Sequence, residues 1–403
     1  MATVTTRSPT APTPTRTPYT AVLRAPHVPV LLAGTLLARL PSAMAPTLVL
    51  LAEHHSGAGL ATAGALSALQ ALMASVVQPL LARAADRYGH RPVLTAATTA
   101  TTLVYLLLAL PGTPLPATVV LIALSGLLAP PAQACLRARW PDLVPTTALQ
   151  CAHALDTSTS ELLYATAPLL AAATVYGTGA GTGYLLAAVL GAAGTLVLFL
   201  ATTVAGTRTR NPRHRDPLGH LRSTDLRWIM GVHAALGAAL GTVAMAGLLI
   251  ATRDHHPSGA GILASCYAAG SLVGGLLFGA RAWPGTPATR FLATTTLMAL
   301  TWIPVVLCPT TLTAALAAVL PGAALAPTLT SGSDLRRERV PDGQAEASGW
   351  VLAALGLGEA LGLVLAGHWP ATWWPALYAT TALAAAALWL HRPTGHPNPR
   401  RTP

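Results

Sequence analysis

The sequence predicts an all-α polytopic membrane protein, in which twelve transmembrane helices form two pseudo-symmetric six-helix bundles. Three observations support this fold class. Of the 403 residues, 53% are hydrophobic and only 9% are charged, whereas soluble domains average about a quarter charged residues. Apolar runs long enough to cross a bilayer recur along the whole chain. A polar, Arg-rich segment near the middle divides these runs into two equal groups.

A bilayer core requires about 20 consecutive apolar residues per helix. Such runs are separated by short polar breaks, of which the one around residues 111–116 is the weakest. We expect spans at residues 28–51, 60–82, 93–110, 117–136, 148–176, 183–205, 228–251, 260–280, 291–308, 312–330, 346–368 and 373–391. Prolines and glycines inside them are expected to bend helices or to permit close approach. These residues are Pro41, Pro130, Pro131, Pro321, Pro327, Gly356 and Gly358.

The arginines test the orientation of the chain independently, since the sequence contains 24 Lys and Arg residues and all of them are Arg. If the N-terminus is cytoplasmic, only Arg253 falls in an outside loop and only Arg39 falls within a span. Cytoplasmic loops of membrane proteins carry an excess of such residues. We therefore expect a plasma-membrane protein with both termini cytoplasmic. The net charge of +11 would then face the anionic inner leaflet, and no nucleic-acid partner is expected.

Two short segments recur at corresponding places in the two halves. EHHSGAGL follows the first span from Glu53, and DHHPSGAGI follows the seventh from Asp254; LRARWPD from Leu136 matches LRRERVPD from Leu335. The two members of each pair are separated by nearly the same number of residues, which indicates that the two halves arose by duplication. Halves repeated in one orientation are a known transporter architecture. We expect a disordered cytosolic tail at 1–26, bundles at 27–206 and 227–391, a cytosolic linker at 207–226 and a cytosolic tail at 392–403.

The loop between the second and third spans reads ARAADRYGHRPVL from residue 82. It resembles the signature loop of the major facilitator superfamily, written G-x-L-a-D-r-x-G-r-r-x-x-l. Asp86, Arg87, Gly89 and Arg91 match the motif, while alanines replace its first Gly and its Leu. The resemblance implies the major facilitator fold, alternating access, and a gating role for this loop at the cytosolic seam between the halves. A short Gly-containing loop with mixed charges can also cap helix ends and form breakable ion pairs.

Two further segments resemble particular groups within this superfamily. RLPSAMAPTLVLL in span 1, together with LRARWP, looks like actinobacterial members, a resemblance that implies no substrate. Span 5 carries LYATAPLLAA, which is similar to the G-x-x-x-G-P-x-x-G-G motif of proton-coupled antiporters. Pro168 matches literally, and Ala167, Ala171 and Ala172 replace glycines. This second resemblance favours drug- or metabolite-like efflux over uptake.

Four charged residues lie within predicted spans: Arg39 in span 1, Asp156 and Glu161 in span 5, and Glu359 in span 11. A charge at mid-membrane costs about 2.5–3.5 kcal/mol on insertion scales, so such residues usually face a cavity or a partner. We expect Glu161 or Asp156 to carry the coupling proton, with Arg39 as its counter-charge or as a substrate anchor. The alternative is a fixed pair that only holds helices together. For Glu359, functional and structural roles are both open.

These features predict a secondary active transporter that couples protons to the efflux of a small amphipathic molecule. Uptake of a polar solute, such as a sugar or an organic anion, is the alternative, and a membrane enzyme or a transport-inactive sensor is a distant one. No P-loop, GxSxG or HExxH motif occurs. The four cysteines stand singly, without metal-type spacing. We therefore expect no catalytic residues, cofactor or metal. The expected partners are a small-molecule substrate, protons and the lipid bilayer, and the protein is expected to be a monomer.

Overall fold

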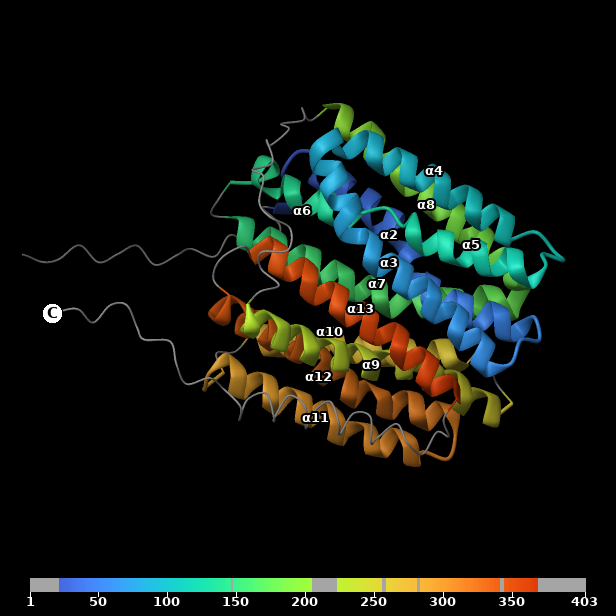
Figure 1. The fold of residues 1–403 in the computed structure, drawn as a ribbon. Helices are drawn as coiled ribbons and strands as arrows, with labels where there is room; N and C mark the ends of the chain where they lie inside the picture. Colours follow the sequence, from blue (N-terminus) through green and yellow to red (C-terminus); the bar gives the residue numbers. More distant parts are fainter. Residues whose placement is uncertain are drawn as a thin grey trace, which may run out of the picture.

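A computed structural model describes residues 22–145, 148–204, 223–255, 259–280, 283–340 and 344–368. These residues form helices and contain no β-strand, which confirms the all-α prediction (Figure 1). The first group of helices comprises α2 (Val28–His55), α3 (Leu60–Tyr88), α4 (His90–Leu108), α5 (Leu115–Leu127), α6 (Ala132–Leu143), α7 (Leu149–Thr178) and α8 (Ala180–Val204). The second comprises α9 (Thr224–Arg253), α10 (Gly259–Ala280), α11 (Pro287–Leu307), α12 (Thr311–Arg339) and α13 (Gln344–His368).

Every predicted span from 28–51 to 346–368 coincides with a helix, or in one case with two. Within the described residues, 9 helical stretches are long and apolar enough to cross a membrane. A shorter apolar helix covers Leu162–Thr178 within α7. The twelfth predicted span, 373–391, lies outside the described residues.

The predicted span 117–136 is interrupted in the structure. It divides into α5, which ends at Leu127, and α6, which begins at Ala132. Pro130 and Pro131 lie in the break. Proline cannot donate a backbone hydrogen bond, and its ring collides with the preceding helical turn. The two prolines therefore separate the apolar α5 from the Arg-containing α6.

Local signals in the sequence account for several of the helix ends. Gly89 joins α3 to α4 at φ = 96°, and Gly179 joins α7 to α8 at φ = 110°. Only glycine adopts these angles readily, so each pair of helices can follow without a longer loop. The Ser223 hydroxyl accepts from the Leu226 N–H at the start of α9, which satisfies one of the helix's unpaired donors.

The contacts between helices form two groups, α2–α8 and α9–α13 (Figure 1). Within the first, α2 packs extensively against α8 and α7; within the second, α9 packs against α13 and α12 against both α10 and α11. Two helix pairs join the groups, α3 with α13 and α7 with α10. These four helices correspond to spans 2, 11, 5 and 8. The chain is therefore built as two helical halves that meet along these four helices.

The apolar core differs between the two ends of the bundle. At the end where α2, α7, α9 and α13 finish, one buried cluster combines both halves, including Leu51, Val175, Leu248 and Ala366. We call this the shared-core end. At the opposite end, where α4 and α11 begin, the buried residues form separate clusters: one around Trp140 in the first half, and others in the second half. We call this the split-core end.

Glycines allow the closest helix contacts of the second half. A Cβ atom at Gly237 or Gly241 of α9 would collide with the backbone of Leu355 or Glu359 in α13. Reciprocally, a Cβ atom at Gly358 would collide with the α9 backbone. Small residues spaced four apart permit such backbone approach between membrane helices. The α9–α13 pair is therefore packed backbone to backbone.

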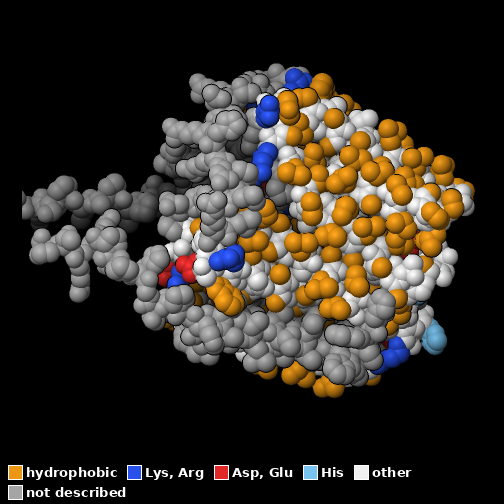
Figure 2. Space-filling model, in the orientation of Figure 1, with side chains coloured by type: hydrophobic (Ala, Val, Ile, Leu, Met, Phe, Trp, Pro, Cys, Tyr) orange, Lys and Arg blue, Asp and Glu red, His pale blue; other side chains and the backbone are white. Residues whose placement is uncertain are grey.

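The outer surface fits a membrane environment. Large apolar side chains such as Leu107, Leu276 and Leu316 are exposed on α4, α10 and α12. Hydrophobic side chains cover most of the described surface visible in Figure 2, and the visible Arg side chains lie mainly toward one end. Lipid tails solvate such a surface, whereas contiguous apolar patches of this extent are rare on soluble monomers.

Candidate functional site

A buried ion pair joins two helices of the first half. Arg39 lies near the middle of α2, and Asp156 lies in the first half of α7. The Arg39 Nη1 atom is 3.8 Å from Asp156 Oδ1. The two residues are 8% and 1% exposed. Because removing charges from water is costly unless they are paired and hydrogen-bonded, each residue needs the other at this position.

Two neutral polar side chains complete this site. Arg39 Nη1 donates to the Ser160 hydroxyl at 3.0 Å, and Ser160 in turn donates to the Asp156 backbone carbonyl at 2.7 Å. Gln133, in the first turn of α6, donates its amide to Asp156 Oδ2 at 3.4 Å and to the Ser160 hydroxyl at 3.3 Å. We call Arg39, Gln133, Asp156 and Ser160 the polar cluster. It links α2, α6 and α7.

The chemistry of the polar cluster follows from its donors and acceptors. Asp156 can hold a negative charge against the guanidinium of Arg39, or take up a proton and become neutral. Uptake of a proton would leave Arg39 without its counter-charge and free the guanidinium to bind an anionic or polar group. The arrangement can therefore exchange a proton, a ligand, or both.

The two charges are among the residues predicted from the sequence, whereas Gln133 and Ser160 are not. Ser160 follows Asp156 by four residues, so both lie on the same face of α7. That spacing within an apolar span was a usable signal. Gln133 gave a weaker one, because only the break at Pro130–Pro131 begins α6 where its side chain reaches α7.

The other two predicted intramembrane carboxylates lie elsewhere. Glu161 is in α7, but its side chain lies outside the described part of the structure. Glu359 is half-buried on α13, in the second half, where its backbone faces Gly237 and Gly241 of α9. Of the predicted carboxylates whose side chains are described, the structure pairs Asp156 with Arg39 and places Glu359 in the other half.

The predicted gating loop connects α3 to α4. Gly89 supplies the turn, Arg87 is exposed with its guanidinium 5.3 Å from the ring centre of Tyr88, and the side chain of Asp86 is outside the described residues. Arg91 Nη2 donates to the Phe199 carbonyl of α8 at 3.3 Å. Arg91 therefore contacts its own half in this conformation, and the gating role of the loop stays a prediction.

The antiporter-like segment of α7 lies at the junction of the halves. Ala167 and Ala171 are fully buried in the cluster at the shared-core end. A Cβ atom at Gly261 of α10 would collide with Ala172 and lie 2.8 Å from the Pro168 carbonyl oxygen. The small residues that replace the motif's glycines therefore still allow close packing between α7 and α10.

The class of protein follows from these features together. Apolar helices with a lipid-facing surface form a multi-pass membrane protein, and buried charges inside such a protein mark substrate or ion pathways by default. The family model described as Major Facilitator Superfamily matches residues 31–282. The chain belongs to the Major Facilitator Superfamily, and it is a membrane transporter of that type.

Solved structures of transporters share the fold. The nucleoside transporter NupG (D323A mutant) has a TM-score of 0.65 at 16% identity, covering 90% of this chain and 98% of its own. A POT family transporter in complex with 5-aminolevulinic acid has a TM-score of 0.69 at 14% identity, with 92% and 96% covered. A bacterial homologue of the iron transporter ferroportin in an inward-facing state scores 0.65 at 15% identity, with 90% and 96% covered. No curated protein matches the sequence.

Proposed function

We propose that this protein is a proton-coupled secondary transporter that exports a small amphipathic molecule by alternating access. The polar cluster is the observation that carries the proposal. A buried carboxylate beside a guanidinium, with a hydroxyl and an amide in reach, provides a group that can bind and release one proton per cycle. Asp156 is the proposed proton-binding group, and Arg39 its counter-charge or a substrate anchor. Glu161 and Glu359 remain further candidates.

The division of the apolar core supports alternating access. The halves share the large buried cluster at the shared-core end and a smaller one of Ala68, Ala360 and Leu363, and they have separate clusters at the split-core end. Rocking of two rigid bundles would break the shared cluster and join the separate ones. The predicted cytosolic arginines near helix ends, such as Arg91, Arg290 and Arg339, belong to the split-core end. We therefore assign that end to the cytoplasm, which makes this conformation inward-facing, with both chain termini cytoplasmic and the protein in the plasma membrane.

The direction of transport rests on the antiporter-like segment of α7. Its small residues and Pro168 lie where α7 meets α10, a position from which a bend in α7 would act on both halves. Arg39 keeps the alternative open, because a guanidinium suits the carboxylate of an organic anion. Under that alternative the protein takes up a polar solute together with a proton.

Vesicles reconstituted with the purified chain test this proposal. With an acidic interior, a proton antiporter is expected to accumulate ethidium, an amphipathic dye, and to release protons from the lumen. A protonophore should abolish both signals. Proton-linked entry of labelled glucose or lactate from an acidic bath would favour the uptake reading. If no probe moves faster than in protein-free vesicles and the protein changes the antibiotic sensitivity of no host cell, a sensor becomes the better interpretation.

A wedge at the junction of the halves tests the conformational part of the proposal. In Gly261→Leu, the new side chain would push α10 away from Ala172 and Pro168 of α7 and open the shared-core end. Overpacking costs about 1–3 kcal/mol, and about 1.4 kcal/mol corresponds to a tenfold population shift. The reporter is a single cysteine, Ala63→Cys on α3, placed in a chain whose native cysteines have been removed. Ala63 is buried in the cluster at the shared-core end. An impermeant maleimide should label this cysteine about ten times faster when Gly261→Leu is also present.

Gly279→Leu serves as the matched control for this wedge, since it lies on the same helix and no atom would lie within 4 Å of its Cβ. Labelling of Ala63→Cys should keep its original rate in that background. Equal rates in the Gly261 and Gly279 variants would contradict the assignment of α7 and α10 to a moving junction.

A further inference from the structure

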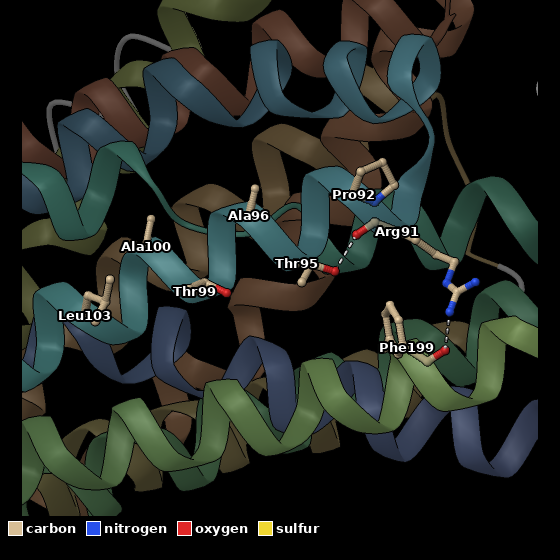
Figure 3. A pocket seen from close by; sticks show the side chains of 8 residues that line it. All are labelled: Arg91, Pro92, Thr95, Ala96, Thr99, Ala100, Leu103 and Phe199. Atoms are coloured by element: carbon tan, nitrogen blue, oxygen red, sulfur yellow. Dashed lines mark hydrogen bonds between the residues drawn. The ribbon is translucent and has the colours of Figure 1, made fainter.

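A groove runs along the outside of the first half, beside the polar cluster but separate from it. One face of α4, from Arg91 to Leu103, forms most of its wall, and Phe199 of α8 closes one end (Figure 3). Its volume is about 850 Å³. Residues twelve apart on a helix are separated by about 18 Å, which matches half of a bilayer's hydrocarbon core, about 15 Å. The groove therefore has the length of one leaflet.

The groove is mainly apolar, with Thr95 and Thr99 also in its lining, and it carries a positive charge at one end. Ala96, Ala100 and Leu103 line the part toward the middle of α4. At the other end, the Arg91 guanidinium lies 4.1 Å from the ring centre of Phe199 and donates one bond to the Phe199 carbonyl. Arg91 Nε has no hydrogen-bond partner among the described residues. Figure 3 shows the guanidinium reaching from α4 toward the Phe199 carbonyl of α8, at the end of the groove. The ring and the carbonyl hold this cation in place at the end of the groove.

Two further residues of basic type lie near Arg91. A smaller adjoining pocket shares Arg91, Thr95 and Phe199 with the groove and is also lined by His90 and Arg139. The described residues that line these two pockets include no Asp or Glu. Guanidinium groups bind phosphate through paired hydrogen bonds, and basic pockets between membrane helices bind anionic lipid head groups. This end of the groove is therefore complementary to a lipid phosphate.

We propose that the groove is a binding site for one anionic phospholipid, with its phosphate at Arg91 and an acyl chain along α4. The site lies at the split-core end, so it opens to the leaflet that faces the cytoplasm in the orientation proposed above. An occupant there would contact both α4 and α8 and hold them together. The inference needs only the membrane location of the chain and does not depend on proton coupling or on the direction of transport.

Native mass spectrometry of the purified full chain in detergent tests the site. With equal concentrations of phosphatidylglycerol and phosphatidylcholine, the wild type should retain phosphatidylglycerol in preference, and Arg91→Gln should lower that preference about fivefold. Arg83→Gln removes the same charge from an exposed position on α3 that does not line the groove, and should keep the preference. The preference of Arg91→Lys for phosphatidylglycerol should lie between those of the wild type and Arg91→Gln, since lysine keeps the charge without the paired donors.

A second pair of variants separates the acyl chain from the charge. Ala96→Trp fills the groove while leaving Arg91 in place, and should lower phosphatidylglycerol retention. Ala293→Trp places the same side chain at an exposed position of α11 in the other half. This variant should retain phosphatidylglycerol as the wild type does. Equal retention of both lipids by the wild type, or an unchanged preference in Arg91→Gln, would overturn the proposal. Displacement of the lipid by millimolar inorganic phosphate would also overturn it, because the site would then be a simple anion site.

Discussion

Asp156→Asn is expected to abolish transport driven by a pH gradient, while downhill movement of the same probe continues. Asparagine keeps the shape of the side chain and its contact with Gln133, but it cannot bind and release a proton. The variant should also be less stable, because Arg39 would remain buried beside a neutral partner. Breaking a buried ion pair in this way costs about 3–5 kcal/mol. The measurement is accumulation of ethidium, or of whichever probe the wild type moves, in vesicles with an acidic interior.

A double variant separates the two readings of the Arg39–Asp156 pair. Arg39→Met combined with Asp156→Leu replaces both charges with apolar side chains, which often restores stability. If the pair only holds α2 and α7 together, this protein should transport under a gradient like the wild type. If Asp156 carries the coupling proton, the melting temperature should recover but gradient-driven accumulation should not. Asp142→Asn, at an exposed carboxylate of α6, is the control and should behave as wild type.

Full gradient-driven transport by Asp156→Asn would remove Asp156 as the coupling group. The experiment would then be repeated with Glu161→Gln, the other carboxylate that the sequence predicts for this role in the same helix.

Gly237→Ala is expected to destabilise the protein, although the same substitution usually stabilises a helix. Alanine exceeds glycine in helix propensity by about 1 kcal/mol. At Gly237, however, the added methyl group would collide with the Leu355 carbonyl of α13, so α9 and α13 would have to move apart. Overpacking of this kind costs about 1–3 kcal/mol. Thermal unfolding in detergent, followed by tryptophan fluorescence, should show a lower melting temperature.

Gly231→Ala provides a control of opposite sign on the same helix. No atom would lie within 4 Å of a Cβ at Gly231, so only the propensity term remains and the melting temperature should stay the same or rise. Gly358→Ala tests the reciprocal contact, since its methyl group would collide with the Ala234 carbonyl of α9. If Gly237→Ala and Gly231→Ala raised the melting temperature equally, the backbone-to-backbone packing of α9 on α13 would be contradicted.

The sequence located the helices well because the signal that defines them is local. A membrane helix must satisfy all its backbone hydrogen bonds internally and present apolar side chains to lipid, so hydropathy along the chain is sufficient to find it. Turn residues such as Gly89 and Gly179 are equally local, because positive φ angles favour glycine wherever they occur. Pro130 and Pro131 also predicted a bend at this point of the chain. That the bend separates α6 as a helix of its own depends on the contacts that the following residues make.

The polar cluster was only partly predictable. The cost of burying a charge indicated that Arg39 needs a partner, and α7 offered two carboxylates. Asp156 and Glu161 are five residues apart, which turns the helix by about 140°, so rotation of α7 about its axis decides which one meets Arg39. Hydropathy does not report that rotation. The structure sets it through packing against α2 and α10, and it thereby brings in Gln133 and Ser160.

By itself, the sequence determined that this chain crosses a membrane repeatedly, roughly where its apolar helices lie, and which loop motif it carries, because each depends on residues close together in the chain. Only the tertiary structure decided which buried charges meet, which glycines face a neighbouring backbone, and at which end the two halves share a core. Those features join residues far apart in sequence, such as Arg39 with Ser160, 121 positions away. They depend on the rotation and approach of whole helices, which are set by the summed packing of many side chains.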